Sequence, residues 1–496
     1  IIGECTSIEN YTFEGCSYLI TIDLPSTIRT IGSYSFANCG NLTNIKIPNV
    51  TSIGDYAFAG CSNLVNIGKI NNTLSIGNVA FQYCINLESV DVVNGISSIG
   101  ECAFEHCKKL SKINTLNGLT MINSSAFNGC SSLKSIEIPS TITNIESDAF
   151  RDCSSLTNIQ IPSSVTNIGN GAFSNCEKLE TISLPYVFTN LGYIFGDNNY
   201  QVPSSLKEIE ILDGCKSISR KAFEQCKDLI KITIPNSVTT IEDYAFEHNQ
   251  LTSVIIPDSV TRIGNRAFSY NQLADIDIPD SVIEIGNLAF NNNKLADSQA
   301  YIYKRTDANN DGIAEIDKTT IISYGGAKKE IIIPNNIQII DNFAFANAEL
   351  TSVEIPSSVT TIGAAAFSSN KLMSAKIPDS VITIADAAFE YNKLTSIEVP
   401  DSVTTIGSGV FRYNQLINVI IGKGVKYISL DLFGKASVSN PNLSKITINR
   451  SCIDIKNIPA SSFESAKYYP WLTSSSPYTV SGVTIYGSNN EVCDSY

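Results

Sequence analysis

The sequence predicts a repeat solenoid, mainly β, built from stacked coils of 22–23 residues each. Phe recurs along most of the 496-residue chain, and most of its intervals are 22 or 23 residues. An Ile stands five residues before nearly every one of these Phe residues, and the pattern L-x-x-I-x-I-P follows them. A single unit cannot bury its own Leu, Ile and Phe side chains, so the units are expected to stack on one shared core.

Each coil is predicted to contain two short strands and a turn. The I-x-I segment alternates with a period of two and is rich in β-branched residues, so it predicts a strand that Pro ends, as in residues 45–48. The S-V-T-x-I-G segment predicts a second short strand that closes at Gly, as in residues 358–363. The A-F-x-x-C step is too short for a regular helix and predicts a tight or 3₁₀ turn.

The turn has two subtypes, F-x-x-C-x-x-L up to Phe223 and F-x-x-N-x-L, one residue shorter, from Phe246 onward. We expect Cys and Asn to occupy the same inward position, where a small buried group can bond the loop backbone of the next coil. Buried free thiols are expected there rather than disulfides or metal ligands. This predicted structural ladder comprises Cys16, Cys39, Cys61, Cys84, Cys107, Cys130, Cys153, Cys176, Cys226, Asn249, Asn271, Asn293, Asn347, Asn370, Asn392 and Asn414.

The subtype change and the breaks in rhythm divide the chain. An interval of 55 residues separates Phe290 from Phe345, so an inserted hairpin or a degenerate repeat is expected between them. The predicted parts are Cys-type repeats at 1–235, Asn-type repeats at 236–295, the insertion at 296–333, Asn-type and degenerate repeats at 334–463, and a C-terminal cap or tail at 464–496.

The repeats resemble one known family. The stretches 150–162 (FRDCSSLTNIQIP) and 355–363 (IPSSVTTIG) are similar to the BspA-type, or Treponema pallidum-type, leucine-rich repeat family, over about residues 1–463. This resemblance implies a leucine-rich-repeat-like, right-handed coil stack on a cell-surface or secreted protein. It further implies adhesion to host matrix proteins, host cells or other microbes, and it brings no catalytic residues.

Composition narrows the function classes. The net charge of −14 makes nucleic acid a poor partner. The sequence contains no run of 18 apolar residues, the length that a membrane-spanning helix needs. Only two His are present, no Cys/His pair has zinc spacing, and no nucleophile elbow or phosphate loop occurs, so no enzyme activity is expected.

The expected binding surface is the exposed face of the I-x-I strands, because their central residues point away from the core. That row is mixed polar with an acidic bias and carries no aromatic residues, which favours a protein ligand over a sugar platform. A merely solvated face is the alternative. Two further hypotheses remain open, a structural spacer or self-associating stalk, and an accessory binding module of a larger surface protein. The candidate positions are Asp23, Lys46, Asp91, Glu137, Gln160, Glu210, Thr233, Asp277, Glu354, Lys376 and Glu398.

Two smaller features complete the prediction. Asp307, Asn309 and Asp311 resemble the first half of an EF-hand calcium loop, although Lys318 stands where a Glu ligand is expected, and a polar hairpin turn is the alternative. No other cofactor is expected. Cys452 and Cys493 lie outside the ladder, and a disulfide between them is a further hypothesis.

Overall fold

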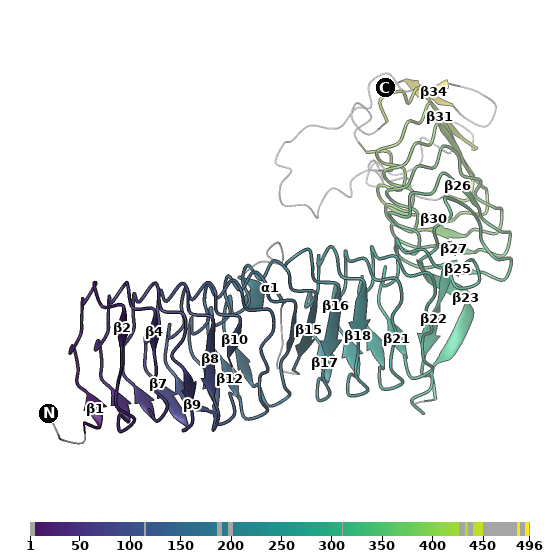
Figure 1. The fold of residues 1–496 in the computed structure, drawn as a ribbon. Helices are drawn as coiled ribbons and strands as arrows, with labels where there is room; N and C mark the ends of the chain where they lie inside the picture. The colour runs from purple at the N-terminus through teal and green to yellow at the C-terminus, as the bar shows by residue number, and fades with distance from the viewer. Residues whose placement is uncertain are drawn as a thin grey trace, which may run out of the picture. The chain divides into compact units, whose positions relative to one another are not determined.

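The computed structural model describes residues 5–113, 116–185, 191–196, 202–309, 311–425, 432–434 and 440–449, and the backbone of two strands at 484–486 and 492–495. The chain forms two compact units. Unit 1 comprises Ile1–Ile241 and His248–Ser259, and unit 2 comprises Glu242–Glu247 and Val260–Tyr496. Each unit is a stack of coils with the β-rich repeat architecture that the sequence predicts (Figure 1).

Most I-x-I segments form short strands that pair in parallel from coil to coil, here called the face strands. In unit 1 equivalent repeat residues pair from coil to coil, for example Ile182 with Ile209 and Ile209 with Ile232. In most face strands the inward Ile or Val residues are buried and the residue between them points outward, whereas Ile22 and Ile113 are half-buried. The face strands of unit 1 are β2 (Thr21–Ile22), β4 (Asn44–Ile45), β6 (Lys69–Ile70), β8 (Ser89–Val92), β10 (Lys112–Ile113), β13 (Asn158–Gln160), β15 (Thr181–Leu184), β16 (Glu208–Ile211) and β18 (Lys231–Thr233).

The segments that end at the repeat Gly, or at the residue that replaces it in some coils, form the second column, here called the glycine strands. Their buried Ile residues also pair in parallel register, as Ile8, Ile31 and Ile53 do. The glycine strands of unit 1 are β1 (Ser7–Ile8), β3 (Thr30–Ile31), β5 (Ser52–Ile53), β7 (Leu74–Ile76), β9 (Ile96–Ile99), β11 (Met121–Ile122), β12 (Asn144–Ile145), β14 (Asn167–Ile168), β17 (Ser217–Ile218) and β19 (Thr240–Ile241).

In the coils that carry it, the repeat Gly stands where neighbouring coils approach closely. A Cβ built on Gly407 would lie 2.4 Å from the backbone N of Asp386 in the preceding coil, and a Cβ on Gly54 would lie 2.7 Å from the N of Ser33. No side chain fits at such a distance, so Gly lets the coils close up where the strand turns.

The segment around each repeat Phe consists of consecutive tight turns. In the third coil Ala57 N–H donates to Gly54 C=O, and Cys61 N–H donates to Phe58 C=O. The residues two before and two after the Phe both have a left-handed backbone, as at Tyr56 (φ 58°) and Gly60 (φ +73°). These left-handed residues separate the i to i−3 bonds into single turns, so no 3₁₀ helix forms anywhere in the described residues.

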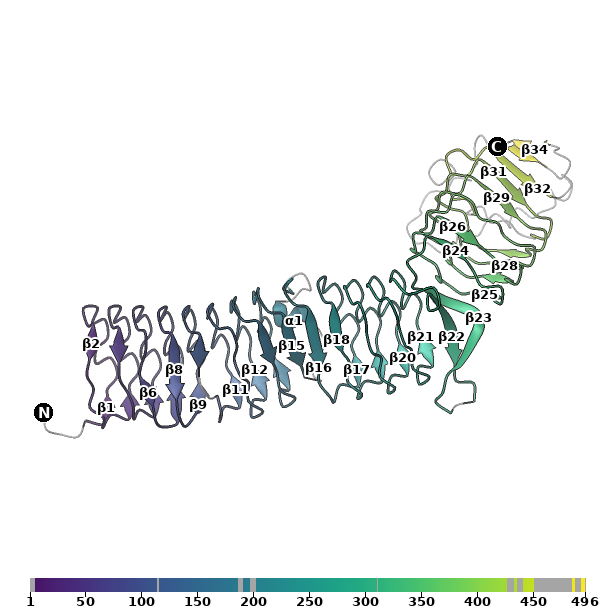
Figure 2. The ribbon, with the colours of Figure 1, turned by 45° about the vertical axis from the view of Figure 1, so that its right-hand side comes forward.

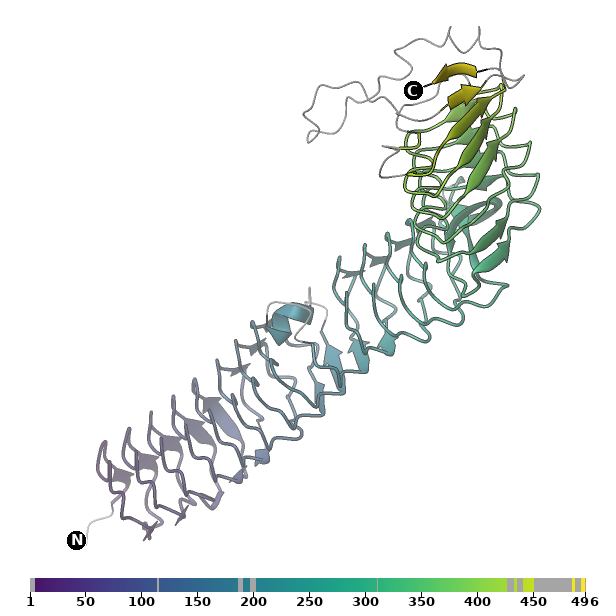
Figure 3. The same cartoon turned by 90° about the horizontal axis from the view of Figure 1, so that it is seen from above.

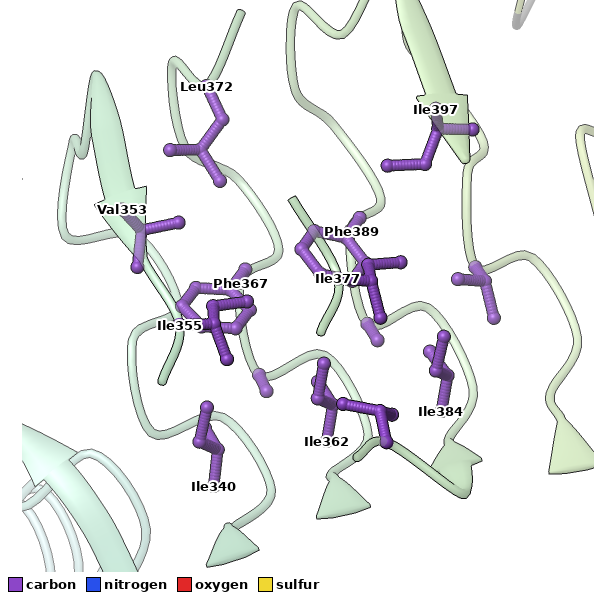
Figure 4. Packing of buried hydrophobic residues seen from close by; sticks show 14 of the residues in the cluster. Ile340, Val353, Ile355, Ile362, Phe367, Leu372, Ile377, Ile384, Phe389 and Ile397 are labelled. Atoms are coloured by element: carbon purple, nitrogen blue, oxygen red, sulfur yellow. The ribbon is translucent and has the colours of Figure 1, made fainter. Parts of the chain in front are cut away.

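Stacked Phe rings fill the centre of each unit. Successive rings from Phe36 to Phe173 lie 5.2–5.6 Å apart and nearly parallel. The Phe rings of unit 2 form a stack of their own, which packs against inward Ile, Val and Leu side chains of neighbouring coils, such as Ile355, Ile362 and Leu372 (Figure 4). Each ring is buried by the coils beside it, which is why one repeat cannot fold alone.

One coil of unit 1 replaces the usual turn by a short helix, α1 (Leu191–Phe195) (Figure 3). The helix still forms backbone hydrogen bonds with the coils on both sides, because Phe173 N–H donates to Ile194 C=O and Leu191 N–H donates to Ala222 C=O. Phe195 is fully buried there.

Unit 2 contains the same two strand columns (Figure 2). Its glycine strands are β20 (Arg262–Ile263), β21 (Glu284–Ile285), β25 (Ile339–Ile340), β27 (Thr361–Ile362), β28 (Thr383–Ile384) and β30 (Thr405–Ile406). Its face strands are β24 (Glu330–Ile332), β26 (Ser352–Glu354), β29 (Ser396–Val399), β31 (Asn418–Ile421), β32 (Lys445–Ile448) and β33 (Thr484–Tyr486), and β34 (Val492–Ser495) pairs antiparallel with β33.

The long interval in unit 2 holds an antiparallel hairpin of β22 (Tyr301–Thr306) and β23 (Glu315–Tyr324). The second hairpin strand also acts as the glycine strand of a shortened coil, because Ile321 pairs in parallel with Ile340. Tyr324 packs its ring 5.4 Å from Phe345 and fills the core where no repeat Phe occurs. The inserted hairpin and the degenerate repeat, which the sequence offers as alternatives, are therefore one and the same segment.

Candidate functional site

Six of the predicted binding positions lie in face strands: Asp91, Gln160, Glu210, Thr233, Glu354 and Glu398. The other five stand in I-x-I segments but outside the bounds of those strands. Ten of the eleven positions are exposed, and Asp91 is half-buried. In unit 1 the strand register places Gln160, Glu210 and Thr233 in one row, with Ser183 between the first two. In unit 2 the same row contains Glu398 beside Ile420. The exposed positions are Asp23, Lys46, Glu137, Gln160, Glu210, Thr233, Asp277, Glu354, Lys376 and Glu398.

Some charges that flank this row are paired with their neighbours. Lys231 Nζ lies 3.1 Å from a carboxylate oxygen of Glu208, and Lys207 Nζ lies 3.5 Å from Asp228. Ser183 Oγ donates a 2.9 Å hydrogen bond to Glu210. The acidic bias expected from the sequence is therefore interrupted by lysines, and the face is a mixed-charge polar surface.

The Cys of the ladder point inward and bond the coil behind them. Cys39 donates from Sγ to the C=O of Phe13 at 3.0 Å, and the equivalent bond recurs at 3.0–3.3 Å through Cys176. The partner lies in the preceding coil and not in the next one, because the side chain points back along the stack. Cys39–Cys176 of the ladder and Cys226 are buried free thiols, whereas Cys16 is exposed.

A side-chain hydrogen bond with Cys61 lowers the pKa of Cys39. Burial makes six other ladder thiols weak acids. It raises the pKa of Cys176 to about 12, and it also raises the pKa values of Cys84, Cys107, Cys130, Cys153 and Cys226. A neutral buried thiol is a poor nucleophile and a poor metal ligand, so the ladder is structural.

The Asn of the ladder make a denser set of bonds. Asn392 Nδ2 donates to the C=O of Phe367 in the preceding coil at 2.8 Å and to the C=O of Phe389 in its own coil at 3.1 Å. Its Oδ1 accepts the N–H of Leu372 at 3.1 Å. The donated bond to the preceding Phe recurs at Asn249, Asn271, Asn293, Asn370 and Asn414.

Asn347 does not belong to this ladder. The ladder position is three residues after the Phe, which is Ala348 in that coil, whereas Asn347 stands two residues after Phe345 and has a left-handed backbone (φ 57°). The prediction missed Asn440, which is fully buried and donates to the C=O of Phe411 and Phe433 at 2.9 Å. Its spacing of seven residues from Phe433 hides it from a fixed motif.

The loop at the tip of the hairpin turns its acidic side chains onto its own backbone. Asp307 accepts hydrogen bonds from the N–H groups of Asp311 and Gly312, and Asn309 Nδ2 donates to Asp311. Across the described ranges, no group of three or more His, Cys, Asp or Glu side chains is placed to hold a metal ion. A calcium site formed by Asp307, Asn309 and Asp311 stays a prediction from the sequence.

The predicted disulfide cannot be placed. Cys452 lies outside the described residues, and only the backbone is described at Cys493. Most of the predicted cap at 464–496 also lies outside them.

Aromatic side chains gather on a surface that the sequence analysis did not single out. They stand two residues before or after the repeat Phe, on the turn edge of the coils, as Tyr34, Tyr83 and Tyr391 do. The fixed offset from Phe was visible in the sequence, but only the left-handed backbone at those positions makes the side chains point outward together.

Comparison with known proteins agrees with the repeat geometry. The chain matches the family described as BspA type Leucine rich repeat region (6 copies) over residues 1–107, 74–201, 193–303 and 323–439. The chain belongs to the BspA-type leucine-rich repeat family. No curated protein sequence matches it.

Solved structures of repeat proteins from bacteria are similar to this BspA-type chain. A leucine-rich repeat protein from Bacteroides ovatus is 26% identical, with 87% of this chain and 92% of that chain covered and a TM-score of 0.43. A leucine-rich cell surface protein from Faecalibacterium prausnitzii is 22% identical, with 84% and 90% covered and a TM-score of 0.35. Among the described residues, the BspA-type chain has no helix with the length and apolarity needed to cross a bilayer.

Proposed function

We propose that this chain is a non-enzymatic cell-surface or secreted protein that binds protein ligands through its face strands, in adhesion or cell recognition. The observation that carries the proposal is the row of exposed, mixed-charge side chains that each unit presents on regularly spaced parallel strands. Such a row offers many weak polar contacts along one surface, which suits a protein partner better than a small molecule. Membership of the BspA-type family supports it further.

The test reverses charges on this face and compares them with equal reversals elsewhere. The face variant carries Asp23→Lys, Glu137→Lys, Glu210→Lys and Glu354→Lys. A matched control carries Glu14→Lys, Glu101→Lys, Asp213→Lys and Asp379→Lys, which are exposed and lie off the face. The two variants have the same net charge, so they differ only in where the charges stand.

Binding is measured by surface plasmon resonance against immobilised fibronectin, fibrinogen and collagen. We expect the face variant to lose at least tenfold in affinity for a matrix protein that the native chain binds, while the control changes less than twofold. Equal losses in both variants, or binding to none of the three proteins, would count against the proposal.

A further inference from the structure

Within each unit, the described residues two after a repeat Phe form an outward column on the turn edge. The backbone aligns them, because Gly60 N–H donates to Gln82 C=O and Tyr83 N–H donates to Glu105 C=O, so each residue sits beside its equivalent in the next coil. All of these residues have positive φ, which turns their side chains away from the core. Neighbouring side chains in the column are therefore about one strand spacing, roughly 4.8 Å, apart.

In unit 1 this column reads Asn38, Gly60, Tyr83 and His106 in successive coils. Tyr83 stacks on His106 with ring centroids 4.9 Å apart, which covers one face of the Tyr ring. The other face looks over Gly60, which has no side chain, and Tyr83 is 49% exposed. Asn38 borders the gap, because its Oδ1 lies 2.6 Å from where a Cβ on Gly60 would be.

Unit 2 repeats the arrangement with Asn347, Ser369, Tyr391 and Tyr413 in successive coils. Tyr391 stacks on Tyr413 at 4.3 Å with an interplanar angle of 7°, and Tyr391 is 50% exposed. The small Ser369 again leaves the opposite ring face of Tyr391 open. Backbone bonds from Asn347 to Ser368 and from Ser369 to Glu390 keep the four residues in line.

A bonded polar pair stands beside each aromatic pair, one residue after the repeat Phe. Gln82 Nε2 donates to Glu105 in unit 1, and Arg412 lies 3.8 Å from Glu390 in unit 2. The carboxamides of Asn38 and Asn347 make no hydrogen bond within the described part of the chain, so their donors and acceptors remain available. Each unit thus has one open ring face, one available carboxamide and one fixed polar pair.

We propose that these two turn-edge platforms bind rings of a neutral carbohydrate. A pyranose ring has an apolar face of C–H groups that packs on an aromatic ring, and its rim of hydroxyls pairs with carboxamide and carboxylate groups. The open area is one ring wide between polar neighbours, far smaller than the contiguous surface of about 1,200 Å² or more that a stable protein complex buries. The carboxylates of Glu105 and Glu390 and the charge of −14 disfavour a polyanionic glycan.

This inference is independent of the proposed function, because it concerns the turn edge and not the face strands. The full chain is examined by affinity electrophoresis in gels that contain β-glucan, α-mannan, xylan or galactan, and oligosaccharides of any polymer that retards it are titrated by NMR. The test variant carries Tyr83→Ala and Tyr391→Ala. Tyr83→Phe with Tyr391→Phe keeps the rings, and Tyr18→Ala removes a 92% exposed Tyr that lies on neither platform.

We expect at least one polysaccharide to retard the native chain, and the double Ala variant to lose at least tenfold in affinity. The double Phe variant and Tyr18→Ala should stay within threefold of the native affinity. A third variant, Ser369→Phe, fills the gap beside Tyr391 and should lower the affinity when combined with Tyr83→Ala. The proposal is overturned if no polysaccharide retards the native chain, if the double Ala variant binds normally, or if only protein binding responds to it.

Discussion

The Cys-type coils of unit 1 and the Asn-type coils of unit 2 both satisfy the buried backbone N–H of the repeat Leu, but with turns that differ in length by one residue. In a Cys-type coil Leu64 N–H donates to Cys61 C=O at 3.0 Å, so a backbone turn satisfies the amide. In an Asn-type coil the equivalent Leu372 N–H donates to Asn392 Oδ1 of the next coil at 3.1 Å. A side-chain amide thus replaces one backbone turn, and the coil becomes one residue shorter.

The difference also changes how strongly each coil depends on its neighbour. The thiol of a Cys-type coil donates one bond to the preceding coil, and sulfur is a weak donor. The carboxamide of an Asn-type coil joins its neighbour through both Nδ2 and Oδ1. Asn-type coils should therefore tolerate loss of the ladder side chain less well, and Cys-type coils should be the ones that respond to alkaline pH.

The largest expected difference is the response to alkaline pH. Burial raises the pKa of Cys176 and of five other ladder thiols, so these thiols stay protonated when folded and ionise when unfolded above their ordinary pKa of about 8.5. The unfolded state then binds fewer protons, and the stability of unit 1 should fall by about 1.4 kcal/mol per thiol for each pH unit above that value.

Unit 2 is the internal control, because its described coils carry Asn, which does not titrate. Pulse proteolysis in guanidinium chloride with mass mapping, at pH 8.0 and 9.5, follows fragments of each unit in a range where ordinary Tyr side chains stay mostly neutral. We expect only the unit 1 fragments to become sensitive at lower denaturant. A parallel shift in both units would show that the thiols do not cause it.

Removing a stacked Phe ring should lower the free energy of unfolding by the same amount in both units, because both stack Phe rings in the same way. Phe127→Ala in unit 1 and Phe367→Ala in unit 2 each remove a fully buried ring and should cost about 3–5 kcal/mol. Fragment-resolved guanidinium unfolding measures both. A cost that differs by more than about 1.5 kcal/mol would mean that the two cores are packed differently.

The repeat pattern predicted the coils, both strand columns and the inward position of Cys and Asn, because each depends on residues at a fixed distance from Phe. It did not predict Asn440, which reaches the ladder from an irregular coil, or the exclusion of Asn347, which is one residue out of register. The outward aromatic column was missed for a different reason. It depends on left-handed backbone at non-glycine residues such as Tyr83 and Tyr391, which propensity rules do not anticipate.

A smaller difference in unfolding free energy should distinguish an Asn of the ladder from an Asn outside it. Asn392→Ala leaves the buried N–H of Leu372 and the C=O of Phe367 without that partner, which should cost about 2–4 kcal/mol. Asn347→Ala, at the half-buried outward position, should cost about 0.5–1 kcal/mol, because Ala tolerates the left-handed backbone there (φ 57°) less well than Asn does. Cys130→Ala should fall between them, because it removes one weak bond and one small buried group. Thermal denaturation of the three variants decides the order, and equal costs for the two Asn variants would refute the assignment of Asn347.

The smallest effect tests whether one coil type can be converted into the other. Cys130→Asn with Ser131 deleted gives the short F-x-x-N-x-L turn, but the N–H that its Oδ1 needs, that of Leu110, already donates to Cys107 C=O. Asn249 shows the same situation at the natural change of subtype, where Leu229 N–H donates to Cys226 C=O. The single conversion should therefore cost about 1–2 kcal/mol.

Converting the preceding coil as well, by Cys107→Asn with Lys108 deleted, frees the Leu110 amide for the new Oδ1. The two conversions together should then cost about 0.5–1.5 kcal/mol less than the sum of each alone, measured as a double-mutant cycle by guanidinium unfolding. Strict additivity would mean that the carboxamide does not link consecutive coils.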